Sequence, residues 1–172
     1  MPFNTLLLTC LTLGRSYSES GIGVQMRSKP GEVALFFAID DQTNPSSTLR
    51  SDLGIEGSIC DCIVYYVQEN RKVICFVELK GRDVKHAGNQ VLNTYRYFKQ
   101  SLDKRLRSLS KACRSQLGQI EWMGLICYSS AAPSGDVRAV SDRFKKEFGK
   151  NKYDIKSISS KRSYDLGELV RK

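Results

Sequence analysis

A carboxylate and an ammonium lie two positions apart in the apolar segment at residues 73–83, VICFVELKGRD. Residues two apart in a β-strand point to the same side of a sheet, so Glu78 and Lys80 would face the same neighbours. Burying either charge alone costs free energy. The spacing therefore predicts one of two arrangements: a site where both charges meet a ligand, or a structural ion pair.

The preceding strand brings a second acid to this pair. Residues 60–80 form a predicted hairpin of two strands, CDCIVYYV and KVICFVELK, joined by QENR. A turn centred in QENR pairs Val67 with Lys72, and the same register places Asp61 opposite Glu78. Both faces of the hairpin are apolar, which predicts interior strands covered on both sides.

After Gly81 the hydrophobic period changes to that of a helix, for which Asp83 is a suitable N-cap. The helix is expected to carry one apolar and one polar stripe. The apolar stripe consists of Val84, Ala87, Val91, Tyr95, Phe98 and Leu102, and the polar stripe of His86, Gln90, Asn93 and Tyr97.

The remaining elements predict an α/β fold with a central mixed β-sheet flanked by α-helices. Beyond the hairpin, strands are expected at 22–26, 33–39, 120–128 and 153–159, the first two paired as a hairpin and the last as the final strand. A loop that could include a short helix is expected at 40–58, a basic amphipathic continuation of the first helix at 104–114, a loop at 129–136 and a helix at 137–148.

Composition narrows the class of protein. Hydrophobic residues make up 41% and no apolar run reaches membrane-spanning length, so no membrane partner is expected. Segment 5–13 lacks the basic start and cleavage site of a signal peptide and is expected in the core. Six cysteines lie mostly in apolar runs, which favours buried reduced thiols in a cytoplasmic protein. The spacing of Cys60 and Cys62 without a second ligand pair argues against zinc.

The net charge of +9 is distributed unevenly along the chain. Residues 1–80 contain 7 basic and 9 acidic side chains, whereas residues 81–172 contain 20 basic and 9 acidic ones. Such asymmetry favours a polyanionic partner, usually nucleic acid. A solvated surface would carry the same charges, so the charge alone does not choose between the two.

The order strand, strand with Glu-x-Lys, helix, strand, helix resembles the PD-(D/E)XK, or restriction-endonuclease-like, nuclease superfamily over roughly residues 58–130. In this resemblance Asp61 corresponds to the first acid, and Glu78 and Lys80 to the (D/E)xK pair. Gln90 corresponds to a glutamine that several branches carry on the following helix.

The resemblance implies one domain over residues 1–172, with an N-terminal hairpin and loop (1–57), a catalytic core (58–130) and a C-terminal helix and strand (131–172). It also implies an endonuclease or exonuclease that hydrolyses nucleic acid with Mg²⁺ or Mn²⁺, DNA in preference to RNA. One such site cuts one strand, so a double-strand cut would require a homodimer.

The chemistry of the residues agrees with this implication. Two carboxylates on adjacent strands can hold Mg²⁺, which takes oxygen ligands and keeps several waters. Asp61 and Glu78 would be these ligands, with the backbone carbonyl of Leu79 as a third. Lys80 would orient or help to deprotonate the attacking water and would stabilise the pentavalent phosphate. Gln90 would hydrogen-bond Lys80 or the substrate.

Basic residues on and near the helices are candidates for contacts with phosphates, although an exposed helix face explains each of them equally well. They are Arg82, Lys85, His86, Lys104, Arg105, Arg107, Lys111, Arg114, Arg143, Lys145, Lys146 and Lys150.

The chain departs from the family pattern in three places. Tyr95 lies five residues after Gln90, so the glutamine-to-tyrosine spacing of one branch is not met. Cys60 precedes Asp61 where many members have proline. A glutamate that several branches carry on an N-terminal helix has no clear equivalent, and Glu19, Glu32 and Glu56 are the candidates.

Two alternatives to a nuclease stay open. One is a nuclease-fold protein that binds nucleic acid without cleaving it. The other is an interaction protein of a defence or mobile-element system in which Glu78 and Lys80 form a structural ion pair. A second acid-x-lysine copy at 154–156 has no preceding hairpin that presents another acid, so it predicts no site.

Overall fold

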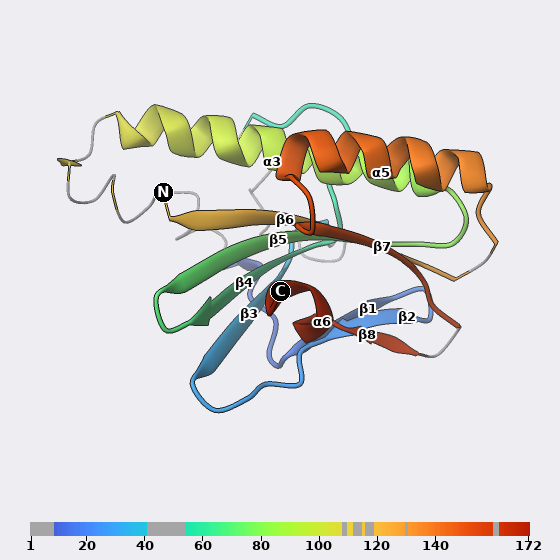
Figure 1. Cartoon of the computed structure of the whole chain (residues 1–172), viewed down its shortest axis with the longest axis horizontal. Coiled ribbons are helices and arrows are strands. Elements are labelled where there is room, and N and C mark those ends of the chain that lie inside the picture. The colour runs from blue at the N-terminus through green and yellow to red at the C-terminus, as the bar shows by residue number, and fades with distance from the viewer. Residues whose placement is uncertain are drawn as a thin grey trace.

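The computed structural model describes residues 9–40, 54–107, 110, 111, 115, 119–129, 131–159 and 162–172. The elements run in the order β1 (Ser16–Glu19), β2 (Ile22–Gln25), β3 (Glu32–Ala38), β4 (Cys62–Gln68), β5 (Arg71–Lys80), α3 (Val84–Leu106), β6 (Ile120–Tyr128), α5 (Ser134–Phe148), β7 (Tyr153–Ser157), β8 (Ser163–Asp165) and α6 (Gly167–Val170) (Figure 1).

Five strands form a mixed central sheet in the order β3-β4-β5-β6-β7. Strands β3, β4 and β5 are antiparallel neighbours; Glu69 and Asn70 form the short turn from β4 to β5, whereas residues 39–61 lead from β3 to β4. Parallel neighbours need a long crossover, and α3 and α5 supply it before β6 and β7. The predicted α/β class with a mixed sheet and helices is confirmed.

The central sheet is covered on both faces (Figure 1). Alpha-helices α3 and α5 lie on one face, where Ile63, Ile74 and Phe76 join the core with the apolar stripe of α3. A small sheet of order β1-β2-β8, together with α6, covers the other face over Val64 and Cys75. Both faces of the predicted hairpin are apolar because both are buried against these layers.

The register predicted for the central hairpin is confirmed. Val67 pairs with Lys72, and Cys62 pairs with Val77, so Asp61 comes directly before the paired region and beside Glu78. The turn residue Glu69 takes a φ of 51°, which closes the reversal. At the start of α3, Asp83 Oδ1 accepts a hydrogen bond from the His86 backbone N–H at 2.8 Å, which confirms the predicted N-cap.

The predicted N-terminal hairpin is wrong. Strands form close to 22–26 and 33–39, but β2 pairs with β1 and β8, and β3 pairs with β4. The turn between them carries the chain from one layer to the other. The strand predicted at 153–159 is present as β7, but the prediction that it is the last strand is wrong, because β8 and α6 follow it. The loop predicted at 129–136 is shorter, since α5 begins at Ser134.

Several predictions fall partly or wholly outside the described residues: the segment at 5–13, the loop at 40–58 with its short helix, and the helical continuation beyond Arg107. Of the cysteines, Cys60, Cys62, Cys75 and Cys127 are buried free thiols, as predicted. Within the described ranges no helix is long and apolar enough to span a membrane.

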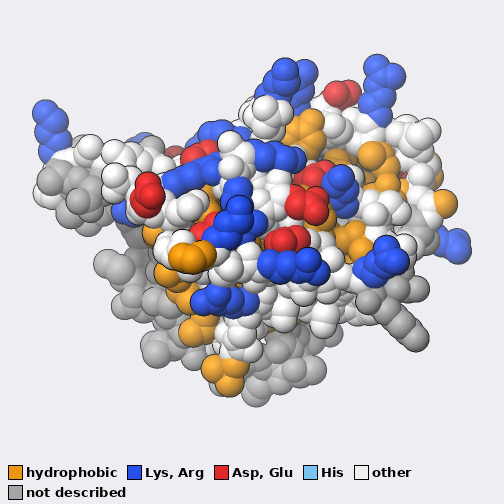
Figure 2. All heavy atoms as spheres, turned by 60° about the horizontal axis from the view of Figure 1, so that its bottom comes forward, with side chains coloured by type: hydrophobic (Ala, Val, Ile, Leu, Met, Phe, Trp, Pro, Cys, Tyr) orange, Lys and Arg blue, Asp and Glu red, His pale blue; other side chains and the backbone are white. Residues whose placement is uncertain are grey.

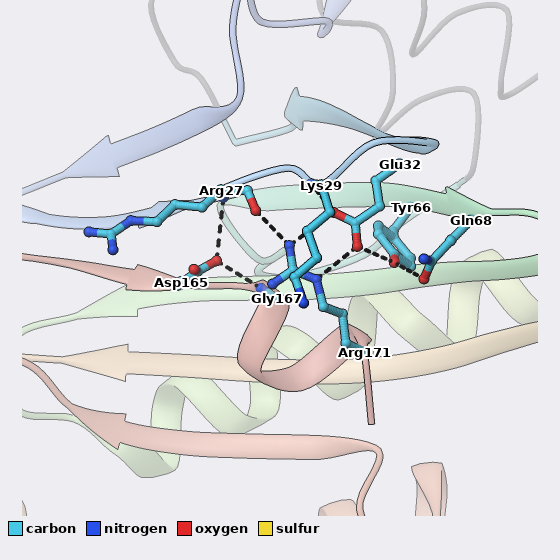
Figure 3. Close-up of polar contacts among 8 residues, drawn as sticks. All are labelled: Arg27, Lys29, Glu32, Tyr66, Gln68, Asp165, Gly167 and Arg171. Carbon is cyan, nitrogen blue, oxygen red and sulfur yellow. Dashed lines mark hydrogen bonds and ion pairs between the residues drawn. The ribbon is translucent and has the colours of Figure 1, made fainter.

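A buried ion pair ties α6 to the central sheet (Figure 3). Arg171 donates through Nε to Glu32 Oε1 at 2.8 Å and through Nη2 to Glu32 Oε2 at 2.9 Å. The Tyr66 hydroxyl donates to Oε1, and the Lys29 backbone N–H donates to Oε2. The Arg171 guanidinium lowers the pKa of Glu32 to about 2. We call Glu32 and Arg171 the α6 clamp.

Candidate active site

Asp61, Glu78 and Lys80 lie together at one end of the central hairpin, on the side of the sheet that α3 covers. Each carboxyl group accepts a hydrogen bond from the backbone of the segment that carries the other one. The backbone N–H of Asp61 donates to Glu78 Oε2 at 3.2 Å, and the backbone N–H of Leu79 donates to Asp61 Oδ2 at 2.7 Å. One oxygen of each carboxyl group is therefore used to hold the pair in place.

Lys80 is oriented between Glu78 and α3. Its Nζ lies 3.5 Å from Glu78 Oε1 and donates to Gln90 Oε1 at 3.2 Å. Gln90 in turn donates through Nε2 to the carbonyl of Ile59 at 2.9 Å, so its amide oxygen faces the lysine. The sequence prediction that Gln90 hydrogen-bonds Lys80 is confirmed.

Two further residues of α3 hold the segment that leads to Asp61. The Thr94 hydroxyl accepts from the backbone N–H of Cys60 at 2.9 Å and donates to the carbonyl of Gln90 at 2.8 Å. Asn93 donates to the carbonyls of Glu56 and Ser58 at 3.0 and 2.9 Å. Sequence analysis missed both roles. Their position one turn beyond Gln90 places them on the same side of α3 as Gln90, but it does not identify their backbone partners.

The electrostatics of the site disfavour two negative charges. Glu78 is fully buried and Asp61 is 5% exposed. Burial raises the pKa of Glu78, and the neighbouring charge of Asp61 raises it further. Burial also raises the pKa of Asp61, with smaller contributions from the charges of Glu19 and Asp40. Lys80 lowers both values without offsetting the burial.

The carboxylates of Asp61 and Glu78 are the donors that a divalent cation would use at this site. Glu78 Oε1 is buried and accepts no hydrogen bond from the described residues, an uncommon state for a native polar atom, although Lys80 Nζ lies 3.5 Å away as an ion-pair partner. No group of three or more His, Cys, Asp or Glu side chains in the described part of the chain is arranged to hold a metal. Two carboxylates are sufficient for Mg²⁺, which retains several waters. The residues therefore fit a cation bound through few protein ligands.

The candidates for the missing glutamate lie in different surroundings. Glu32 belongs to the α6 clamp and pairs with Gln68, at the opposite end of β3 and β4 from Asp61, so it is not part of the site. Glu56 is exposed and lines a pocket beside α3. Glu19 is near enough for its charge to raise the pKa of Asp61.

The basic candidates divide into three groups. Lys104, Arg107 and Arg143 line pockets along α3. Arg82, Lys85 and His86, near the start of α3, are exposed, as are Lys111 and, on or after α5, Lys145, Lys146 and Lys150. The side chain of Arg105, and Arg114, lie outside the described part.

In the second acid-x-lysine copy, at 154–156, the acid has a structural role. Asp154 Oδ2 accepts a hydrogen bond from the Tyr164 hydroxyl at 2.9 Å, and Oδ1 accepts one from the Ile155 backbone N–H at 2.9 Å. Both oxygens are thus used, in contrast to Glu78 Oε1.

Comparisons of the chain with models of protein families, with curated proteins and with solved structures found no match.

Proposed function

We propose that the chain is a metal-dependent nuclease with a restriction-endonuclease-like core, which hydrolyses phosphodiester bonds of nucleic acid, DNA in preference to RNA. The observation that carries the proposal is Glu78 Oε1, a buried carboxylate oxygen without a hydrogen bond, next to Asp61 and Lys80. Among the described residues this oxygen has an ion pair with Lys80 at 3.5 Å and no hydrogen bond, and a buried acceptor without one costs about 1–3 kcal/mol, which a bound cation would offset.

The roles of the side chains follow from their contacts. Asp61 and Glu78 would hold Mg²⁺ or Mn²⁺, with the carbonyl of Leu79 as a further ligand. When bound, such a cation lowers the pKa of a coordinated water and stabilises the charge that develops on the phosphate. Lys80 is half-buried, with its Nζ held by Gln90, so that it can donate to the attacking water and to a phosphate oxygen. Gln90 is a positioning residue.

The test combines cleavage with metal binding. Plasmid, linear duplex, single-stranded DNA, a branched junction and RNA are incubated with Mg²⁺ or Mn²⁺, and Mn²⁺ binding is measured by calorimetry. Asp61→Asn and Glu78→Gln should lose both cleavage and Mn²⁺ binding. Lys80→Met should lose cleavage by at least about a hundredfold but still bind Mn²⁺. Glu168→Gln, at an exposed acid of α6 outside the pair and outside the pockets beside α3, should change neither.

A wild-type protein that neither cleaves any of these substrates nor binds Mn²⁺ would refute the proposal. The folding of each variant is checked by circular dichroism, so that a loss of activity is not a loss of structure.

One observation favours a second candidate, a nuclease-fold protein that binds nucleic acid without cleaving it. The ammonium of Lys80 already lies 3.5 Å from Glu78 Oε1, which partly neutralises the acid without a metal. Such a protein would retain salt-dependent binding to nucleic acid and show no cleavage.

A further inference from the structure

A groove runs along the exposed side of α3 and begins next to the candidate active site. Its first part, of about 330 Å³, lies between the segment at 56–58, α3 and Arg143 of α5. Its second part, of about 370 Å³, continues along α3 to Arg107. Arg96 lines both parts, which makes the two pockets neighbours. We call these two pockets together the α3 groove.

Five cations line the α3 groove, and four of them come from one face of one helix. Residues three or four apart lie on the same face of a helix; Arg96 and Lys99 are three apart, Lys104 and Arg107 are three apart, and the second pair follows the first by eight residues, about two turns. They are Arg96, Lys99, Lys104 and Arg107, joined by Arg143 from α5.

Most of this positive charge remains available to a ligand. Of the three acids in the groove, Glu147 is paired with Arg96, whereas Asp103 and Glu56 are exposed. Arg143 uses one N–H on the neutral Asn89, which leaves other donors of its guanidinium. Lys99 donates to the Tyr95 hydroxyl and keeps further ammonium protons.

The groove and the candidate active site share a segment of backbone. Asn93 in the groove binds the carbonyl of Ser58, and Gln90 at the site binds the carbonyl of the next residue, Ile59. Asp61 follows two residues later. A polymer lying in the groove would therefore continue toward Asp61.

We infer that the α3 groove is a docking surface for duplex nucleic acid, held through its phosphate backbone. The inference rests on the proposed function for the class of substrate. From Asn89 to Lys104 the helix extends roughly 22 Å, which corresponds to about six base pairs of duplex. Single-strand binding sites stack bases on exposed aromatic rings. The lining residues include one aromatic ring, Tyr95, which is buried against Phe148 and Trp122 and offers no such platform.

The experiment measures binding of a 30-base-pair duplex in EDTA at several salt concentrations, so that no cleavage occurs. The groove variant replaces Lys99, Lys104, Arg107 and Arg143 by Gln. The control variant makes the same change in charge at Arg138, Lys145, Lys150 and Lys172, which are exposed and do not line the groove. Three of these residues, Lys145, Lys150 and Lys172, line a separate pocket outside the α3 groove.

The groove variant should bind at least about tenfold more weakly, and the slope of log K against log salt should fall by about three to four. The control should stay within about threefold of the wild type. Basic side chains also occur toward α6, interspersed with acidic ones (Figure 2), which makes this charge-matched control necessary. Equal losses in the two variants, a larger loss in the control, or no loss in either would overturn the inference.

Single-stranded DNA and RNA of equal length serve as additional ligands. Tighter binding of the single strand than of the duplex would contradict the assignment to duplex. The double variant Lys104→Gln/Arg143→Gln repeats the test if the fourfold variant does not fold.

The binding test and the cleavage test can fail separately. If the wild type binds through the groove but never cleaves, the docking surface stands and the nuclease proposal falls. If it cleaves with Mg²⁺ while groove and control variants bind alike, the nuclease proposal stands and the docking surface falls.

Discussion

Glu78 sits where its charged form is disfavoured by burial and by the neighbouring Asp61. A carboxyl group whose pKa is higher in the folded protein than in the unfolded chain binds its proton more tightly when folded. The free energy of unfolding is then greatest below the unfolded pKa, and it falls as the pH rises toward the folded pKa. The apo protein therefore loses stability from this group between weakly acidic and alkaline pH.

Glu78→Gln should remove this pH-dependent loss of stability, because glutamine has no titratable carboxyl group. We expect the free energy of unfolding of the wild type, measured by urea denaturation without metal, to fall by about 1–3 kcal/mol from pH 5 to pH 8 because of this group. The free energy of unfolding of the variant should change less between pH 5 and pH 8, so its stability relative to the wild type should be greater at pH 8 than at pH 5. Glu56→Gln, an exposed acid, serves as the control. Parallel profiles of wild type and Glu78→Gln would show that Glu78 is already charged at pH 5.

At the scale of residues, the sequence was informative where the partner lay on a neighbouring strand. Counting from the turn places Asp61 opposite Glu78, because the side-chain period of a strand leaves one register with apolar faces matched. The partners of Thr94 could not be predicted. One is the backbone N–H of Cys60, in a segment whose path over α3 is set by tertiary packing and leaves no pattern in the sequence.

At the scale of elements, the distance between α3 and α5 depends on a glycine. A Cβ added to Gly88 would lie 2.7 Å from Val140 Cγ1 and 2.9 Å from Cγ2. Real Cβ contacts are longer than this, so one helix would have to shift. Because α3 carries Gln90 two residues later, a shift of the helix would also move the partner of Lys80.

Gly88→Ala should therefore destabilise the protein by about 1–3 kcal/mol, in spite of the better helix propensity of alanine. In a Val140→Ala background the same change should cost little or be stabilising, because the crowding methyl groups are absent. Urea denaturation of the four proteins in a double-mutant cycle measures the coupling. An equal cost in both backgrounds would mean that the helices do not touch at this point.

Element prediction failed where a local turn was taken for a hairpin. The stretch around 28–31 does reverse the chain, but a reversal does not determine which strands pair. Ile22 and Val24, in β2, are buried between the second layer and the central sheet, whereas Phe36 and Phe37 lie on the two faces of the central sheet beside β4. The four-residue α6 is too short to leave a hydrophobic period in the sequence.

At the scale of the whole molecule, the second layer is held to the central sheet by contacts between distant parts of the chain. Beta-strand β2 pairs in parallel with β8, which follows it by about 140 residues, and the α6 clamp joins positions 32 and 171. No sequence window contains both partners, which is why neither contact could be predicted. The clamp lies on the face opposite to α3, so its removal tests the stability of the second layer separately from the candidate site.

Breaking the clamp from one side should cost more than removing it altogether. Arg171→Met leaves the buried Glu32 without its cation and should destabilise the protein by about 1–3 kcal/mol, since the 22% exposure of the Arg171 side chain limits the cost. The double variant Glu32→Gln/Arg171→Met should recover part of that loss. Because the pKa of Glu32 is lowered to about 2, the stabilisation is present above pH 4.5 and is lost as the pH falls toward 2. Urea denaturation at pH 7 and pH 3 measures both effects, and an Arg171→Met variant that loses equal stability at the two pH values would show that the ion pair is not their source.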